Sequence, residues 1–105
     1  MSLITVSYNS EQTIRDTIES VLVQDYEAIE YIIIDGGSTD STIEIINKYK
    51  DNIQIFVSEP DQGIYDAMNK GVKFSSGDII GVINSDDFYP NRYVISSVVE
   101  QFIKH

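Results

Sequence analysis

Two adjacent carboxylates, Asp86 and Asp87, are the sharpest chemical feature of the sequence. Neighbouring carboxylates repel each other unless a cation or hydrogen bonds compensate. They come shortly after an expected strand, residues 78–83, and so lie at its carboxyl end, where they could hold Mg²⁺ or Mn²⁺. The alternative is that one of them caps a helix that begins near Pro90. Their position after a buried strand favours the metal site.

A third carboxylate, Asp35, follows the apolar run 31–34 and precedes two glycines. At the mouth of a sheet its oxygens could accept hydrogen bonds from a base or a ribose. The competing interpretation is a turn in which Asp35 bonds to the backbone that follows it, and the local sequence slightly favours that turn. Tyr8 offers a ring that could stack on a base, although a tyrosine at a strand end is more often part of the rim of a core.

Strands and helices must alternate to position these groups. Short β-branched runs alternate with amphipathic helical stretches four times, which predicts an α/β fold with about four parallel strands and helices in three layers. The carboxyl ends of parallel strands meet at one edge of a sheet, so the polar residues that follow each run should gather there. The expected strands cover residues 3–7, 31–34, 53–58 and 78–83.

The helices carry start signals of several kinds. Asn9, with Gln12 three residues later, predicts the N-cap of the first helix, and residues 41–44 (STIE) match a capping box for the second. Asp61 is expected to cap the third helix, and Pro90 marks the region where the fourth begins. The inward stripe of the third helix is expected to consist of Ile64, Met68, Gly71 and Val72.

Composition bounds the class of the protein. A chain of 105 residues with 42% hydrophobic content predicts one domain over residues 1–105. The net charge of −10 argues against nucleic acid as a partner, and an anionic diphosphate ligand would require a divalent cation to offset the repulsion. The sequence contains no cysteine, which favours a reducing compartment, with the cytoplasm as the expected location.

Several enzyme classes lack their signatures. Neither the glycine-rich dinucleotide fingerprint nor a P-loop occurs at a strand-to-helix turn, which counts against a dinucleotide oxidoreductase and a P-loop phosphotransferase. A receiver-like phosphotransfer domain would need a lysine at a comparable strand end, and the sequence has none there.

Four blocks of sequence resemble glycosyltransferase family 2, a group of inverting enzymes with the GT-A fold. In the order in which the family carries them, they are residues 5–9 (TVSYN), 35–40 (DGGSTD), 59–71 (EPDQGIYDAMNKG) and 77–87 (GDIIGVINSDD). The resemblance spans the whole chain and implies a Rossmann-like, nucleotide-sugar-binding half of the catalytic domain. It further implies a nucleotide-diphosphate sugar donor, with a UDP-sugar favoured, and a saccharide or lipid-linked acceptor in polysaccharide biosynthesis.

The same resemblance implies roles for particular residues. Asp86 and Asp87 fall on the acidic motif that ties Mn²⁺ or Mg²⁺ to the donor diphosphate and so stabilises the leaving nucleotide. Asn69 either lines the sugar pocket or fastens its helix to the sheet, and the second role is favoured. The residues implied to bind the nucleotide sugar are Val6, Tyr8, Asn9, Asp35, Gly36, Asp66 and Asp86.

Three departures from the family pattern matter. Asn84 begins the acidic motif where many relatives have aspartate, and Gly36 stands where many carry a second aspartate. The catalytic base is expected beyond residue 105, so this chain is expected to bind the donor without transferring the sugar. The alternative is a non-catalytic nucleotide-sugar-binding or assembly module. Truncation would also expose a sheet edge, which predicts a homodimer through that face. The sequence leaves open whether the longer protein associates with a membrane through later segments.

Overall fold

Four parallel strands form one sheet in the order β3-β2-β1-β4. The computed structural model describes residues 1–104, and their side chains through residue 101. The predicted α/β class is confirmed, with each strand within two residues of its expected position. The strands are β1 (Ser2–Ser7), β2 (Glu30–Asp35), β3 (Ile55–Ser58) and β4 (Ile80–Asn84).

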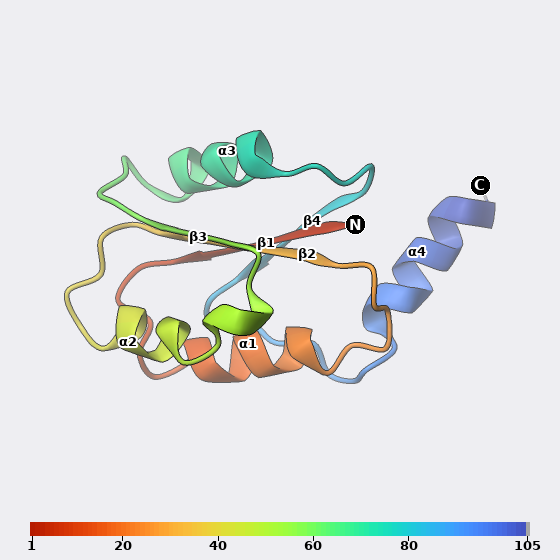
Figure 1. The fold of residues 1–105 in the computed structure, drawn as a ribbon, viewed down its shortest axis with the longest axis horizontal. Helices are drawn as coiled ribbons and strands as arrows, with labels where there is room; N and C mark the ends of the chain where they lie inside the picture. Colours follow the sequence, from red (N-terminus) through yellow and green to blue (C-terminus); the bar gives the residue numbers. More distant parts are fainter. Residues whose placement is uncertain (105) are drawn as a thin grey trace.

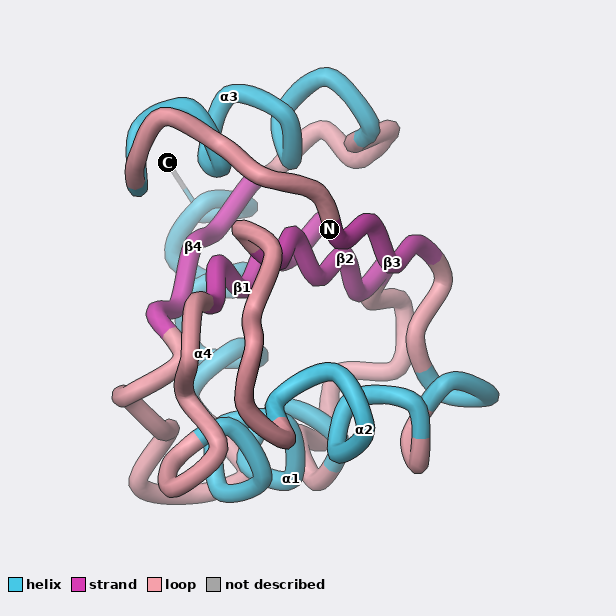
Figure 2. The backbone as a smooth tube through the Cα atoms, turned by 90° about the vertical axis from the view of Figure 1, so that its left-hand side faces the viewer, coloured by secondary structure: helices cyan, strands magenta, loops and turns pink. Residues whose placement is uncertain are grey.

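Helices cover both faces of this sheet, as a parallel sheet requires. In Figure 1, α3 (Ile64–Phe74) lies on one face, while α1 (Ile14–Leu22) and α2 (Thr42–Asn47) lie on the other. Figure 2 shows the sheet between these two layers. A short 3₁₀ turn (Lys50–Asn52) precedes β3, and α4 (Val94–Lys104) extends away from one end of the sheet. The three-layer arrangement is therefore present.

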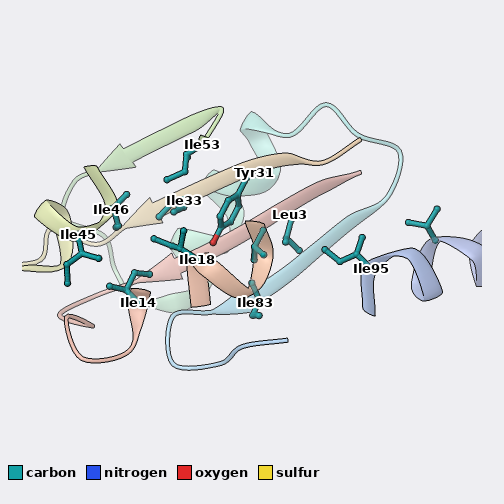
Figure 3. Close-up of a cluster of buried hydrophobic side chains, with 12 residues drawn as sticks. Leu3, Ile14, Ile18, Tyr31, Ile33, Ile45, Ile46, Ile53, Ile83 and Ile95 are labelled. Carbon is teal, nitrogen blue, oxygen red and sulfur yellow. The ribbon is translucent and has the colours of Figure 1, made fainter. Parts of the chain in front are cut away.

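The two central strands, β1 and β2, contribute side chains to the core on both faces of the sheet. Successive side chains of a strand point to opposite faces, so Leu3 and Ile33 pack under α1 and α2, whereas Ile4 and Ile32 pack under α3. Figure 3 shows the larger of the two clusters, in which Ile18 and its neighbours on the helices meet the strand residues. All of β1 is buried, which explains why its sequence is continuously apolar or small.

The face that α3 turns to the sheet is narrower than expected. Ala67 and Gly71 are its buried residues, whereas Ile64 and Val72 are exposed, so the predicted stripe is wrong at those two positions. A Cβ atom on Gly71 would lie 2.6 Å from Cγ2 of Ile4, which shows how closely the helix backbone approaches β1. Small residues permit this approach, and larger apolar side chains are pushed to the flanks.

Two start signals act differently from their predicted roles. Asn9 is not the N-cap of α1, because that helix begins at Ile14 after Thr13. Asn9 instead has a positive φ of 46°, and its Oδ1 accepts a hydrogen bond of 2.8 Å from the backbone N–H of Thr39. The second helix does begin after Ser41, but no side chain of a capping box bonds its first turn.

The cap of α2 comes from the preceding residue. Asp40 Oδ1 accepts a hydrogen bond of 2.9 Å from the backbone N–H of Thr42. Burial raises the pKa of Asp40, but its hydrogen bonds with Thr42 and with the backbone of Glu11 outweigh this and leave the pKa below its ordinary value.

Strands β3 and β4 form the two edges of the sheet. Ile80 and Val82 on β4 are both exposed, so the edge predicted to support a homodimer carries apolar side chains, and the homodimer itself stays a prediction. Within residues 1–104, every helix is too short or too polar to cross a bilayer.

Candidate functional site

A cleft of about 460 Å³ opens at the carboxyl edge of the sheet. It lies between the ends of β1 and β4 and the first turns of α3, which is the edge where open parallel sheets bind ligands. Its volume falls within the range of small-molecule sites. The cleft is lined by Val6, Ser7, Tyr8, Ser10, Asp61, Gly63, Ile64, Ala67, Asn84, Ser85 and Asp86.

The end of β4 brings oxygen ligands to this cleft. Asp86 lines it with an exposed side chain, and Asp87 is exposed beside it without lining it. Asn84 also lines the cleft, and its Oδ1 is the one buried side-chain polar atom without a hydrogen-bond partner among the described residues. A buried carbonyl oxygen left unpaired is costly, so this atom is available to a ligand or cation.

The alternative role of the two aspartates as a helix cap is wrong. The fourth helix begins at Val94, well beyond Asp87. In its first turn, the backbone N–H of Ile95 donates to Oε1 of Gln24 over 3.0 Å, so a side chain that follows α1 bonds this end of the helix. Neither Asp86 nor Asp87 therefore caps α4.

The residues at the end of β4 suit a hard divalent cation that takes its remaining ligands from water or phosphate. Two carboxylates and an amide oxygen are the oxygen donors that Mg²⁺ or Mn²⁺ accepts. Nowhere in residues 1–104 do three His, Cys, Asp or Glu side chains gather closely enough to hold a metal ion. This part of the chain could therefore hold such an ion by one or two side chains, with the remaining ligands from water or phosphate, but it does not enclose one.

Asp35 lies fully buried, at 0% exposure, beneath the turn that follows β2. Its Oδ1 accepts hydrogen bonds from the hydroxyls of Ser7 (2.8 Å) and Ser38 (2.6 Å). Its Oδ2 accepts from the Ser58 hydroxyl (2.9 Å) and from the backbone N–H groups of Gly37 (3.0 Å) and Ser38 (2.8 Å). These bonds are those of the turn interpretation, and Asp35 is not among the residues that line the cleft.

The electrostatics of Asp35 follow from these contacts. Burial raises the pKa of the carboxyl, but hydrogen bonds from Ser38, Ser7 and Ser58 stabilise the charged form and bring the pKa below its ordinary value. Asp35 is therefore ionised, and its hydrogen bonds hold the ends of β1, β2 and β3 together.

The loop after β1 places a ring at the mouth of the cleft. Tyr8 is 61% exposed and lines the cleft together with Val6, so its ring is available to a ligand. Asn9 lies outside the cleft lining, and its backbone N–H donates to the hydroxyl of Ser38 over 2.8 Å. Gly36 is buried, and its N–H donates to the carbonyl of Ser7 over 2.9 Å. The loops after β1 and β2 are thus tied together.

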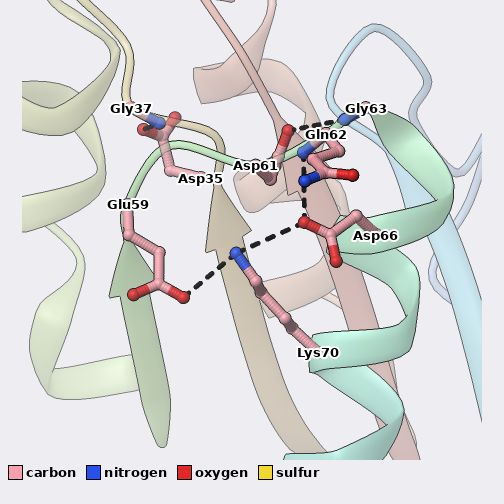
Figure 4. Close-up of polar contacts among 8 residues, drawn as sticks. All are labelled: Asp35, Gly37, Glu59, Asp61, Gln62, Gly63, Asp66 and Lys70. Atoms are coloured by element: carbon pink, nitrogen blue, oxygen red, sulfur yellow. Dashed lines mark hydrogen bonds and ion pairs between the residues drawn. The ribbon is translucent and has the colours of Figure 1, made fainter.

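The loop between β3 and α3 supplies two cleft residues that sequence reasoning missed, Asp61 and Gly63. Asp61 was expected only as a helix cap, yet it lines the cleft, and α3 begins after Gly63. Asp61 Oδ1 accepts a hydrogen bond of 3.0 Å from the backbone N–H of Gly63, which has a positive φ of 118° (Figure 4). Its position just past a strand end was the signal that could have identified it.

A neighbouring ionic cluster holds this loop in place. Asp66 Oδ2 accepts from the backbone N–H of Gln62 over 3.1 Å and lies 3.6 Å from Lys70 Nζ, which also pairs with Glu59 at 3.0 Å (Figure 4). Asp66 is not among the cleft-lining residues. Asn69 is exposed on α3, and its side chain makes no hydrogen bond to another described residue, so the prediction that it fastens the helix to the sheet is wrong.

The comparison with known protein families decides the identity of this arrangement. The family model described as glycosyl transferase family 2 matches residues 2–105. The chain belongs to glycosyl transferase family 2.

Relatives of this family 2 chain come from several bacteria. It is 38% identical over 101 residues to an uncharacterized glycosyltransferase of Mycobacterium tuberculosis, covering 95% of this chain and 38% of the relative. It is 41% identical over 99 residues to the Escherichia coli protein named UDP-Glc:alpha-D-GlcNAc-diphosphoundecaprenol beta-1,3-glucosyltransferase WfaP, covering 93% of this chain and 39% of that protein. The chain therefore spans under half the length of these relatives.

Solved structures share the fold. The complex of Staphylococcus aureus TarS with UDP-GlcNAc matches with a TM-score of 0.91 at 26% identity, covering 99% of this chain and 31% of that one. Glucosyl-3-phosphoglycerate synthase from Mycobacterium tuberculosis, in complex with Mn²⁺, UDP and phosphoglyceric acid, matches with a TM-score of 0.74 at 28% identity, over 96% of this chain and 38% of that one. The predicted GT-A, Rossmann-like architecture is confirmed.

Proposed function

We propose that this chain forms the donor-binding part of a glycosyltransferase that transfers a sugar from a UDP-sugar to a saccharide or lipid-linked acceptor in polysaccharide biosynthesis. The observation that carries the proposal is the cleft at the carboxyl edge, where the Tyr8 ring and the Asp86 carboxylate line one space. Family membership supports it, as do the UDP-glucose named for the E. coli relative and the UDP-GlcNAc bound by TarS.

Each cleft residue has a part in this proposal. The exposed ring of Tyr8 stacks on the base, and Val6 forms the wall behind it. Asp86 and Asp87 hold Mn²⁺ or Mg²⁺, and the unpaired Oδ1 of Asn84 offers a further oxygen beside them. The cation would neutralise charge on the leaving diphosphate. The chain, with a net charge of −10, has few basic side chains that could do this.

Residues outside the cleft lining act on the donor through the loops. Asp35 ties the turn that carries Gly36, and Asn9 ties the loop that carries Tyr8 to the same turn. Asp66 holds the loop before α3 through Gln62. In this proposal these residues position the nucleotide-binding surface and do not supply its contacts with the reacting atoms.

We also propose that transfer is inverting and uses a general base from outside residues 1–105, so that this chain alone binds the donor without transferring the sugar. Inversion needs a base on the side of the anomeric carbon opposite the leaving diphosphate. An assay of nucleotide release with and without an acceptor saccharide tests this. Acceptor-dependent turnover by the 105-residue chain would refute it, whereas binding without turnover is also the result expected of a non-catalytic module.

Calorimetric titration of UDP and GDP, each with and without Mn²⁺, tests donor binding. In the Asp86→Ala, Asp87→Ala double variant we expect Mn²⁺-dependent affinity to fall by at least about tenfold, since the loss of a charge-assisted contact costs roughly 1.5–3 kcal/mol. The control is Asp16→Ala with Asp51→Ala, which removes two exposed carboxylates away from the cleft. UDP binding that is equally tight in the cleft double variant would contradict the metal site.

A further inference from the structure

Asp61 occupies space that a side chain at position 36 would otherwise fill. A Cβ atom built on Gly36 would lie 2.8 Å from Asp61 Oδ2 and 3.1 Å from Asp61 Cγ. The turn after β2 therefore lacks a side chain at the point where the loop after β3 delivers a carboxylate. Because Asp61 also lines the cleft, the carboxylate beside Gly36 faces the space that a ligand would enter.

One oxygen of Asp61 is anchored and the other is free for a ligand. Oδ1 accepts the hydrogen bond from the backbone N–H of Gly63, which fixes the orientation of the side chain. Oδ2 receives no hydrogen bond from any residue in the described part of the chain. Asp35 differs, since its two oxygens together accept five hydrogen bonds inside the protein. Of these two carboxylates on the β2 and β3 side, Asp61 is thus the one with an oxygen to offer.

The order of the strands places Asp61 away from the metal side of the cleft. The sheet order is β3-β2-β1-β4, so Asp61 follows one edge strand and Asp86 follows the opposite one. If the diphosphate lies at Asp86, as the proposed function requires, the nucleoside extends past Tyr8 toward Gly36 and Asp61. A carboxylate there meets the nucleoside and not the phosphates.

We infer that Asp61 is a specificity-determining residue whose Oδ2 accepts a hydrogen bond from the ring imide N–H of a uracil base. An ionised carboxylate only accepts hydrogen bonds, so it pairs with the N–H at position 3 of uracil. Cytosine carries an unprotonated acceptor nitrogen at that position, and two facing acceptors repel each other. This inference rests on the proposed function and adds to it the residue that selects the base.

Calorimetric titration of UDP and CDP in the presence of Mn²⁺ tests the inference with Asp61→Asn. The asparagine keeps Oδ1 for the N–H of Gly63 and replaces Oδ2 by an amide that donates. We expect the chain to bind UDP at least about tenfold more tightly than CDP, and Asp61→Asn to bring the two affinities within about threefold, because the amide can donate to the cytosine nitrogen. Gly36→Ala should also reduce the preference for UDP over CDP, because the new Cβ atom would displace the Asp61 carboxylate.

A control variant and a second nucleotide separate the possible failures. Asp16→Asn, an exposed carboxylate on α1, should leave the preference unchanged. An unaltered preference in Asp61→Asn, with UDP still bound, would refute the base contact alone, whereas a parent chain that binds no nucleotide would refute the proposed function. Asp61→Asn that weakens UDP but leaves 2′-deoxy-UDP unaffected would mean that Asp61 reads the ribose, and the inference would be wrong.

Discussion

Removal of the Asp35 carboxylate should destabilise the fold more than its neutralisation. In Asp35→Ala, the backbone N–H groups of Gly37 and Ser38 lose their acceptor and cannot turn away, while the hydroxyls of Ser7 and Ser58 can find other partners. Each buried donor left unpaired costs about 1–3 kcal/mol, so the variant should lose about 3 kcal/mol of unfolding free energy. Domains of this size have roughly 5–15 kcal/mol in total.

Asp35→Asn is the matched variant, because its side chain has the same shape without the charge. Its carbonyl oxygen can still accept from the two backbone N–H groups, and its amide can donate to the serine hydroxyls, which rotate. Only the additional strength of charge-assisted hydrogen bonds is lost, which predicts a cost of about 1.5 kcal/mol. Urea unfolding followed by circular dichroism at pH 7 measures both costs.

The pH dependence provides an independent check. The pKa of Asp35 is lower in the folded chain than in the unfolded chain, where it is about 3.9. The stability that the charge contributes is therefore fully present above about pH 5 and is lost as pH falls through the folded pKa. The difference in unfolding free energy between the parent chain and Asp35→Asn should shrink as pH falls from about 5 toward 2.

Two results would refute this reasoning. One is a cost below about 1 kcal/mol for Asp35→Ala, which would mean that water replaces the carboxylate easily. The other is a difference between the parent chain and Asp35→Asn that stays constant from pH 7 down to about pH 2, which would mean that the charge of Asp35 has no stabilising partners.

Two further predictions concern packing against β1. Gly71→Ala should lower stability by about 1–2 kcal/mol despite the better helix propensity of alanine, because the new Cβ would lie 2.6 Å from Ile4 Cγ2. Thermal unfolding measures this loss. Adding Ile4→Ala to the same chain should remove the clash and with it the loss attributed to the clash. Tyr31→Phe should lower the unfolding free energy by about 1–2 kcal/mol, because the buried hydroxyls of Tyr31 and Thr5 lie 2.8 Å apart and share a hydrogen bond. In urea unfolding, adding Thr5→Val should recover part of this loss. If the effects of the two substitutions were strictly additive, the hydrogen bond would be contradicted.

The strands and their order along the chain could be predicted because burial leaves a strong local pattern. A parallel strand covered on both faces is a continuous apolar run, as residues 31–34 are, and a helix repeats its apolar residues at three- and four-residue intervals. The starts of the helices could be predicted less well, because caps depend on contacts with other loops. Asn9 looked like an N-cap from its spacing, but its Oδ1 instead accepts a hydrogen bond from the backbone N–H of Thr39 in another loop.

For the candidate site too, the sequence determined some features and the tertiary structure determined others. Sequence alone determined the α/β class and the gathering of polar residues at the carboxyl edge, because these depend on local periodicity and on the connectivity of parallel strands. Only the tertiary structure decided that Asp35 is enclosed by the ends of three strands and that Asp61 fills the space beside Gly36. Both outcomes depend on distances between segments far apart in the chain, and no local pattern encodes such distances.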